Sequence, residues 1–557
     1  MGTRAGLGDV GHTYATCEPK PSHTWRMVCF GFRKAIGVAP PSITAFGLRR
    51  LGVMLDQPSG AAVAPLAVLN ALFEALAQRD VRCCHWKSNS HLAEAVRGET
   101  DLDLLVEQSR ADVFREVAAS LGFKLVRAAP GKHYPGVENH LGYDDETGRL
   151  VHLHVHYHLV LGQQHVKDYR LAIEDQLLRS TVDADGIPIP APRMELIILA
   201  LRAVLKYRLR DALKDLLGIR SPGIPRAIRT EAEWLLSNTT PEEVRRALDE
   251  LGPSIPANLV LEIIGRLTSP RLRGVRLLVV REQVRWALRP MLRLPRWRAT
   301  GRYAAALWRK RTHAAGIGTK RRMTLRSGGT SIAFVGSDGA GKTTVVAAVE
   351  EWLGWRLDVG SFYMGIPEPT GGRWILKNVS KLTRSAYRRT ERTWGEDRLV
   401  SRRIRAVSQV SVALRRVGEA KTRLRRNRLA QRRAAAGAVV LFDRYPLPSV
   451  AVFGRAMDGA RLEQEIDKPW APAVARLVAR ERELYGRIAP PDRVLALSVT
   501  AAESLRRKPD HDPDGIAAKT EAIRTMVTDG TEVAVIDADQ HVDRVVAEVK
   551  AKIWAWL

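Results

Sequence analysis

The stretch "FVGSDGAGKTTVV", residues 334–346, decides the fold of the carboxy-terminal part of this 557-residue chain. It satisfies the pattern G-x-x-x-x-G-K-[ST], which forms a phosphate-binding loop where it joins a strand to a helix. The flanks fit, because "SIAFV" before the loop has a strand pattern and "TTVVAAVEEWL" after it has a helix pattern. A chance glycine-rich turn is the alternative, and these flanks argue against it.

Each residue type in this loop has a physical role. Glycines let the backbone curl so that its N–H groups point inward around phosphates, and the start of the helix adds its positive end. Lys342 would neutralise the β and γ oxygens, and the Thr343 hydroxyl would help to hold Mg²⁺. We expect the following residues to contact the bound phosphates: Gly336, Ser337, Asp338, Gly339, Ala340, Gly341, Lys342, Thr343 and Thr344.

Two later elements fit phosphoryl chemistry. The strand "AVVLFD" ends at Asp443, where a fold of this kind places a residue that handles Mg²⁺, and Arg444 follows. An Asp that caps a helix is the alternative. "SLRRKPDHDPDG" places Arg506, Arg507 and Lys508 together. Taken alone this is a solvated charge run, but in series with the other two elements it predicts a lid that offsets charge on a transferring phosphoryl group.

Further apolar strand patterns, "DRVLALSVT" and "TEVAVIDAD", alternate with helix patterns after residue 328. Apolar strands between helices predict a parallel sheet with helices on both faces. The fold class expected for 328–557 is therefore an α/β P-loop domain.

The order of these motifs resembles thymidylate kinase and its nucleoside monophosphate kinase relatives over about 328–557. The resemblance rests on "GSDGAGKTT", "LFDRYP", "RRKPDHDP" and the closing "VIDADQHVDRVVAEVKAKIW". It implies transfer of the ATP γ-phosphoryl group to a monophosphate such as dTMP, with Mg²⁺ as cofactor. A dimer would also agree with the resemblance.

Carried over by position, Lys342 and Thr343 would hold ATP and Mg²⁺, Asp443 and Arg444 would lie at the acceptor phosphate, and Arg506 or Arg507 would be the lid arginine. The chain departs from the family at "GIPEPTGG", which lacks the Arg of the usual Arg-Glu-Pro-Gly. The upstream arginine for the acceptor phosphate has three candidates: Arg423, Arg425 and Arg426. These departures leave the identity of the acceptor open.

A second informative stretch is "HWKSNSHLAEAVRGETDLDLLV", residues 85–106. Asp101 and Asp103 would lie on the same face of a strand, and two carboxylates side by side can hold Mg²⁺ for nucleotidyl transfer. Lys87, Ser88 and Asn89 lie upstream, where a turn could present donors to a phosphate. Residues 65–185 thus resemble the nucleotidyltransferase fold, in which a Gly-Ser turn precedes an Asp-x-Asp strand.

That family usually has a third carboxylate on a later strand, and the corresponding stretch here is "LVHLHVHYHLVLG". Read as one strand, it places His152, His154, His156 and His158 on one face. Four imidazoles could bind a transition metal, receive an acidic ligand, or be half-buried polar groups. The activity of this domain stays open at this point.

Charge and composition indicate the kind of partner. Lys plus Arg outnumber Asp plus Glu by 88 to 60, giving a net charge of +28, which favours a nucleotide, a phosphorylated small molecule, nucleic acid or an acidic membrane surface. The most basic segment, about 373–434, has a helical pattern; a basic flap over an anionic substrate is preferred to nucleic-acid or acidic-lipid binding. The rival functions are a nucleotidyltransferase with a regulatory P-loop module and a nucleic-acid-associated NTPase.

Four parts are expected along the chain: a disordered segment 1–60, an α+β nucleotidyltransferase-like domain 61–185, a basic helical connector 186–327 and the P-loop domain 328–557. The four cysteines lack metal-binding spacing, which fits a reducing cytoplasm. No apolar run reaches the ~20 residues of a spanning helix, and residues 1–60 lack a signal-peptide pattern. The expectation is a cytoplasmic protein with, at most, peripheral membrane contact.

Overall fold

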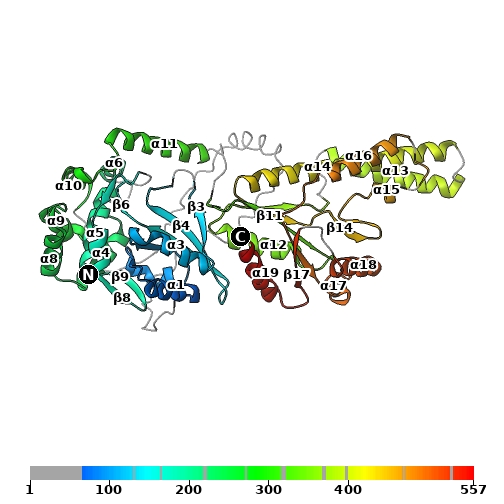
Figure 1. The fold of residues 1–557 in the computed structure, drawn as a ribbon. Helices are drawn as coiled ribbons and strands as arrows, with labels where there is room; N and C mark the ends of the chain where they lie inside the picture. Colours follow the sequence, from blue (N-terminus) through cyan, green and yellow to red (C-terminus); the bar gives the residue numbers. More distant parts are fainter. Residues whose placement is uncertain are drawn as a thin grey trace, which may run out of the picture. The chain divides into compact units, whose positions relative to one another are not determined.

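A computed structural model of the chain describes residues 65–557, apart from short gaps, so the expectation for 1–60 lies outside the described residues (Figure 1). The gaps are 130–131, 164–165, 218–222, 270–271, 315–321, 367–371, 395–398, 467, 471 and 527–530.

The first sheet has six strands in the order β1-β2-β5-β4-β3-β10. Strands β2 and β5 run parallel, and the other neighbours are antiparallel. The bounds are β1 (Cys83–His85), β2 (Leu102–Val106), β3 (Lys124–Arg127), β4 (Val137–Asp144), β5 (Arg149–His156) and β10 (Thr324–Leu325). The parallel register pairs Asp103 with His154, so residues far apart in the sequence meet at the centre of the sheet.

Alternation along β2 and β5 separates an apolar face from a polar one. Leu102 and Leu104 of β2, with Leu153 of β5, pack under α1 (Ala67–Gln78) and α3 (Ala111–Ser120). Because successive side chains point to opposite faces, Asp101, Asp103 and the histidines of β5 lie on the other face of the sheet. The short helix α2 (Leu92–Val96) leads into β2.

The expected single strand over 150–162 is wrong in one respect, because two strands cover it: β5 ends at His156 and β6 (Leu159–Leu161) follows. The Tyr157 N–H donates to the Gly136 carbonyl, and the chain then turns so that β6 pairs with β7 (Tyr169–Leu171). His158 therefore leaves the face shared by the other three histidines, and its Nδ1 lies 3.6 Å from Glu174.

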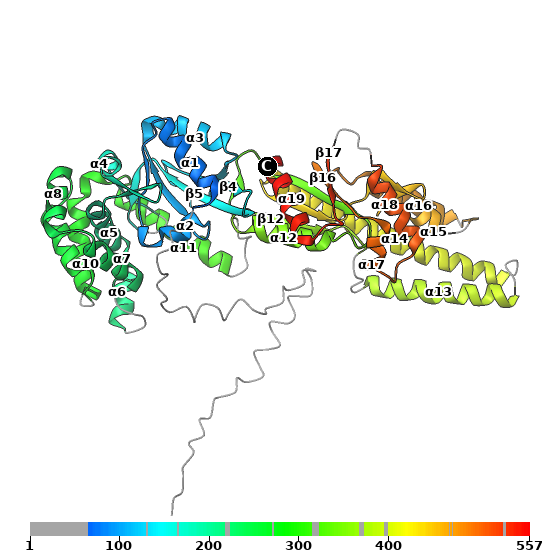
Figure 2. The ribbon, with the colours of Figure 1, turned by 90° about the horizontal axis from the view of Figure 1, so that it is seen from below.

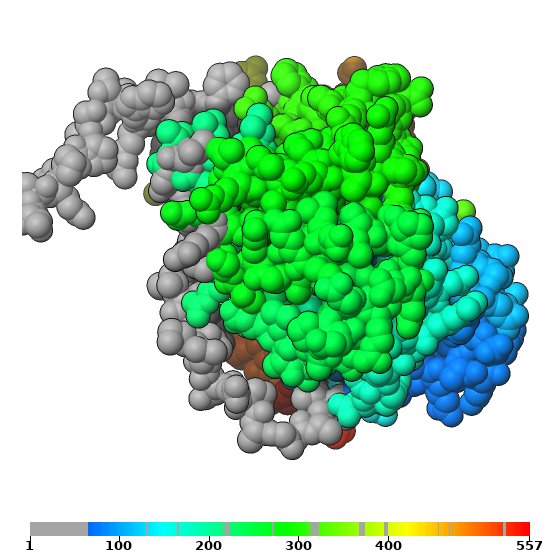
Figure 3. Space-filling model, turned by 90° about the vertical axis from the view of Figure 1, so that its left-hand side faces the viewer, coloured from blue at the N-terminus to red at the C-terminus, as the bar shows by residue number. Residues whose placement is uncertain are grey.

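Helices of the expected basic connector share a core with this first sheet. The central one is α5 (Pro192–Lys206), which is buried on nearly every side, as expected for a helix that is apolar all round. Around it lie α7 (Arg226–Ser237), α8 (Pro241–Leu251), α9 (Ala257–Leu267) and α10 (Gly274–Ala287), which form much of the green surface in Figure 3. The remaining elements here are α4 (Glu174–Arg179), β8 (Thr181–Ala184), β9 (Ile187–Pro190), α6 (Leu209–Leu216) and α11 (Arg296–Ala314).

The second sheet has five parallel strands in the order β12-β13-β11-β16-β17, which confirms the expected parallel α/β sheet. The bounds are β11 (Thr330–Gly336), β12 (Val359–Tyr363), β13 (Val439–Asp443), β16 (Arg493–Ser498) and β17 (Glu532–Asp537). The sequence pattern did not reveal β12, "VGSFY", because this edge strand carries Gly and Ser and lacks a continuous apolar run.

Helices cover both faces of the second sheet (Figures 1 and 2). In β11, Ile332 and Phe334 pack with α12 (Lys342–Gly354) and α19 (Val542–Trp556), whereas Ala333 and Val335 face the other side. That side is covered by α14 (Leu399–Ala435) and α18 (Pro513–Arg524). The remaining elements are α13 (Gly372–Trp394), β14 (Leu447–Val452), β15 (Arg455–Met457), α15 (Leu462–Glu465), α16 (Pro472–Gly486) and α17 (Ala501–Arg507).

The basic segment expected to be helical forms α13 and α14, which lie side by side as a long pair (Figure 2). Within the part of the chain that the structure describes, no helix combines the length and the apolar character needed to cross a bilayer.

Candidate functional site

The glycine loop lies between β11 and α12, at the carboxyl ends of the parallel strands. Strand β11 is flanked by β13 on one side and β16 on the other, so the strand order reverses there. In open parallel sheets, ligands bind in the crevice at such a reversal. Gly339 and Gly341 have φ values of 92° and 80°, a left-handed conformation that side chains rarely adopt. The loop therefore needs glycine at both positions.

Lys342 is held inside the loop. Its side chain is buried, and its Nζ donates to the carbonyl oxygens of Gly336 at 2.9 Å and Ser337 at 2.6 Å. Burial, together with the nearby Arg444 charge, lowers the pKa of Lys342 to about 8. The ammonium group is therefore charged at pH 7 but sits where a further anion would stabilise it.

Thr343 and Asp443, the two residues expected to handle Mg²⁺, lie in contact. The Thr343 hydroxyl donates to Asp443 Oδ2 at 2.8 Å, across 100 residues of sequence. Among the described residues, the buried Asp443 Oδ1 has no hydrogen-bond donor. A buried carboxylate oxygen without a donor, beside a hydroxyl at the glycine loop, fits the oxygen ligands that Mg²⁺ prefers.

Asp338, inside the loop, is gripped by two cations. Its Oδ1 accepts from Arg444 Nη2 at 2.9 Å, and its Oδ2 pairs with Lys519 of α18. Burial opposes ionisation of Asp338, but the hydrogen bonds from Lys519 and Arg444 outweigh it and lower the pKa of the carboxyl group. Arg444 itself has a φ of 70° and also lies 3.8 Å from Asp458. Sequence reasoning missed Lys519 and Asp458, because no motif marks them and only the fold brings them to the loop.

The two arginines expected in the lid take different positions. Arg507 reaches the loop, donating from Nη1 to the Gly339 carbonyl at 3.2 Å and from Nη2 to the Ala538 carbonyl at 3.0 Å. Arg506 is 74% exposed and pairs with Glu503. The structure thus places Arg507, and not Arg506, against the glycine loop.

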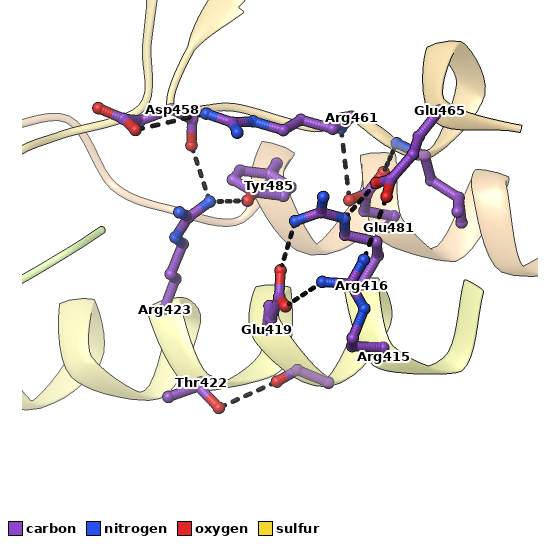
Figure 4. A network of polar contacts seen from close by, with 12 residues as sticks. Arg415, Arg416, Glu419, Thr422, Arg423, Asp458, Arg461, Glu465, Glu481 and Tyr485 are labelled. Atoms are coloured by element: carbon purple, nitrogen blue, oxygen red, sulfur yellow. Dashed lines mark hydrogen bonds and ion pairs between the residues drawn. The ribbon is translucent and has the colours of Figure 1, made fainter. Parts of the chain in front are cut away.

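The three candidates for the upstream phosphate-binding arginine also separate. Arg423 is buried on α14 and donates to the Asp458 carbonyl at 2.8 Å, and it also contacts the Tyr485 hydroxyl (Figure 4). Arg425 is exposed, and Arg426 donates to the Tyr363 carbonyl. Arg423 therefore supports the residue that pairs with Arg444. The stretch "GIPEPTGG" lies mostly outside the described residues.

A polar network ties α14 to α15 and α16 beside this arginine (Figure 4). Arg416 bonds to Glu465 at 2.5 Å and to Glu419 at 2.8 Å, and Glu481 accepts from the Leu462 N–H at 2.9 Å. Next to the network is a cavity of about 340 Å³. Its lining includes Pro446, Pro448, Arg461, Glu481 and Tyr485. Arg461 lies 3.6 Å from Asp458, which connects this cavity to Arg444.

The aspartates of the first sheet have distinct partners. Asp103 Oδ1 lies 2.7 Å from Lys87 Nζ and 2.8 Å from His154 Nδ1. Asp101 lies 2.7 Å from His152 Nδ1 and also pairs with Arg356. β5, which is described throughout, carries no Asp or Glu, so the position opposite Asp103 holds an imidazole instead of a third carboxylate.

The expected donor turn precedes these aspartates. Ser88 adopts a left-handed conformation with a φ of 61°, and its Oγ accepts from Arg202 at 3.2 Å. Asn89 is buried and donates to Glu195 from its N–H at 3.1 Å and from Nδ2 at 2.7 Å. Lys167 lies close by, and burial together with the charge of Lys87 lowers its pKa to about 7. This concentration of cations favours an anion at the turn.

Comparison with known proteins gives weak similarity. No family model matches the chain. The chain is 26% identical over 222 residues to the protein YghR, described as an uncharacterized ATP-binding protein, in two strains of Escherichia coli. The match covers 37% of this chain and 80% of that protein.

Two solved structures of deoxyadenosine kinase from M. mycoides, with bound dATP and with bound dCTP, also align with the chain. They are 14% identical to it, and each alignment covers 40% of this chain. The alignments cover 98% and 99% of the two structures, with TM-scores of 0.25 and 0.24. Similarity at this level carries no argument about fold or activity.

Proposed function

We propose that the chain is an ATP-dependent phosphotransferase of the nucleoside monophosphate kinase type. It would move the γ-phosphoryl group of ATP to a monophosphate acceptor such as dTMP. The observation that carries the proposal is the buried Lys342, which is held inside a glycine loop beside the Thr343–Asp443 pair. This loop lies where the strand order of the parallel sheet reverses. The description of the Escherichia coli relative as an ATP-binding protein supports ATP as the ligand.

The side chains on the ATP side would have separate roles. Lys342 would offset charge on the β and γ phosphates, and Arg507 would bring a second cation to the same loop. Thr343 and Asp443 would hold Mg²⁺, which when bound neutralises phosphate charge and orients the γ-phosphoryl group. Asp338 would position the loop by holding Arg444 and Lys519 in place.

The acceptor side is proposed around Arg444. This guanidinium lies between Asp338 and Asp458, which leaves it oriented but not buried beyond reach of a ligand. A planar guanidinium binds phosphate oxygens in a two-point geometry, so Arg444 suits an acceptor monophosphate. The neighbouring cavity of about 340 Å³ would take the rest of the acceptor.

The test is to incubate the full chain with ATP, Mg²⁺ and a panel of nucleoside monophosphates, and to measure ADP and the acceptor diphosphate. We expect one monophosphate to be converted, with loss of conversion in Lys342→Ala. Lys421→Ala is the matched control, because that lysine is exposed on α14 and is not among the residues placed at the loop. No turnover of any monophosphate by a folded protein that binds ATP would overturn the monophosphate acceptor.

Nucleotidyl transfer by the first domain is the second candidate. The observation that favours it is the pair of aspartates, Asp101 and Asp103, on one face at β2, with Lys87 in an ion pair with Asp103. His154 at the third position counts against the usual three-carboxylate arrangement. Release of pyrophosphate from a nucleoside triphosphate, lost in Asp103→Asn and kept in Lys342→Ala, would establish this activity.

A further inference from the structure

Three ligand atoms in the first domain converge on one point. His154 Nδ1 lies 2.8 Å from Asp103 Oδ1, and His156 Nε2 lies 3.6 Å from the same oxygen. The two imidazole nitrogens are 3.2 Å apart. Around a tetrahedral ion with bonds of about 2.0–2.2 Å, ligand atoms lie roughly 3.3–3.6 Å from one another. The three atoms are thus already spaced almost as ligands of one ion.

We propose that Asp103, His154 and His156 form a binding site for a divalent transition-metal ion of the zinc class. Imidazole nitrogen suits Zn²⁺ and its transition-metal neighbours, whereas Mg²⁺ prefers a shell of oxygens. Two imidazoles with one carboxylate therefore select a different metal from the one that a set of carboxylates would hold. The site lies in the first sheet and does not depend on the proposed kinase activity.

The neighbouring Asp101–His152 pair provides a comparison, because the partners of its imidazole are those of a purely structural histidine. His152 Nδ1 lies 2.7 Å from Asp101, and its Nε2 lies 3.1 Å from the Asn139 side-chain oxygen. Both ring nitrogens of His152 thus have oxygen partners other than Asp103, and neither nitrogen faces the proposed metal position. His154 and His156 instead direct one nitrogen each toward Asp103 and toward each other.

The site is open on one side. The side chains of His154 and Asp103 are 26% and 17% exposed, so an ion can reach them from solvent. His156 is buried and packs edge-on against Trp86, with ring centroids 5.1 Å apart, which fixes its orientation. A fourth ligand position facing solvent would be left for water or an anion.

Lys87 is a built-in competitor for this site. Its Nζ lies 2.7 Å from Asp103 Oδ1, the same oxygen that faces both imidazoles. A bound dication would repel this ammonium group, so the lysine has to withdraw when the metal enters. Removing the lysine charge should therefore strengthen metal binding, which a purely structural hydrogen-bond network would not predict.

The experiment measures binding of Co²⁺ and Zn²⁺ to the full chain after stripping with EDTA. Co²⁺ is followed by its visible absorption, and Zn²⁺ by calorimetry. We expect the His154→Gln and His156→Gln variants each to bind one ion fewer per chain, or to bind the ion with an affinity at least about tenfold lower. Lys87→Met should bind at least severalfold more tightly. A large excess of Mg²⁺ should not displace the Co²⁺.

Two controls make the result decisive. His91→Gln removes an exposed histidine that lies beside Glu94, and it should bind as the wild type does. His152→Gln removes the structural pair, and it should keep the ion. If the buried His156→Gln variant fails to fold by near-ultraviolet circular dichroism, the partly exposed His154→Gln decides. Unchanged binding in His154→Gln, equal loss in His152→Gln, or displacement by Mg²⁺ would overturn the proposal.

Discussion

The glycine loop and the Asp–His group of the first sheet, which consists of Asp103, His154 and His156, both bring ionisable side chains together beside parallel strands. They do so in different ways. The residues that form the glycine loop are consecutive in the sequence, and local backbone conformation sets their geometry. The Asp–His group joins strands 51 residues apart, and only the register between β2 and β5 brings it together. A contiguous motif therefore predicts its own geometry, whereas a site built by strand pairing depends on the whole sheet.

The largest effect is expected at the loop. Thr343→Val and Asp443→Asn each remove an oxygen proposed to hold Mg²⁺, so phosphoryl transfer should fall about 10²–10³-fold. Steady-state rates with saturating ATP measure this, with Thr312→Val on α11 as the control. A loss below about tenfold would show that the Thr343–Asp443 contact does not organise the metal.

The next effect is the pH dependence of ATP binding at the loop. Bound phosphates favour the charged form of Lys342, whose pKa in the free protein is lowered to about 8 from an ordinary 10.5. Below pH 8 the lysine is already protonated, and above pH 8 ATP binding must take up a proton. ATP affinity should therefore fall by up to about tenfold per pH unit above 8.

Calorimetry in two buffers of different ionisation enthalpy measures this proton uptake directly. Uptake should appear at pH 9 and be small at pH 7, and Lys342→Met should abolish it. Equal uptake at both pH values would place the titrating group elsewhere.

A smaller effect is expected on the acceptor side. Arg444→Lys keeps the charge but loses the planar fork, so the KM for the acceptor should rise about tenfold or more, while the KM for ATP changes little. Varying both substrates, with the acceptor identified by the panel, gives the two constants. A parallel rise in both would mean that Arg444 acts through Asp338 and the loop instead.

The smallest effect tests whether the two sites are independent. Asp103→Asn lies in the other sheet, so phosphoryl transfer should stay within about twofold of the wild-type rate. A large loss would indicate coupling, and the contact between Arg356, which follows α12, and Asp101 would be the first place to look. Arg356→Met would then reproduce the loss.

Much of the second domain follows from its sequence. The helix expected to start near Lys342 begins at that residue, and the strands around Asp443 and residues 493–537 are parallel as predicted. Edge strand β12 was missed, because exposure and hydrogen bonding on one side relax the need for an apolar run. Lys519 was missed for a different reason: an isolated lysine on a helix carries no pattern, and it reaches Asp338 across 181 residues.

The histidine stretch shows the opposite balance. Alternation correctly places His152, His154 and His156 on one face, because side chains of a strand alternate whatever surrounds it. It fails at His158, because the Tyr157 backbone bonds to Gly136 and the strand ends there. Where a strand stops depends on its partners, and no local pattern in this stretch records them.

The sequence alone determined the glycine loop between strand and helix, with its glycines, Lys342 and Thr343, because the conformational and chemical demands of these residues lie within one short segment. Only the tertiary structure places Arg507 rather than Arg506 at the loop and brings Lys519 to Asp338. It also distinguishes His152, whose two ring nitrogens each have an oxygen partner, from His154 and His156, whose nitrogens face Asp103 and each other. Each of these choices depends on contacts between segments distant in sequence, where the register of strands and the packing of helices set which side chains meet.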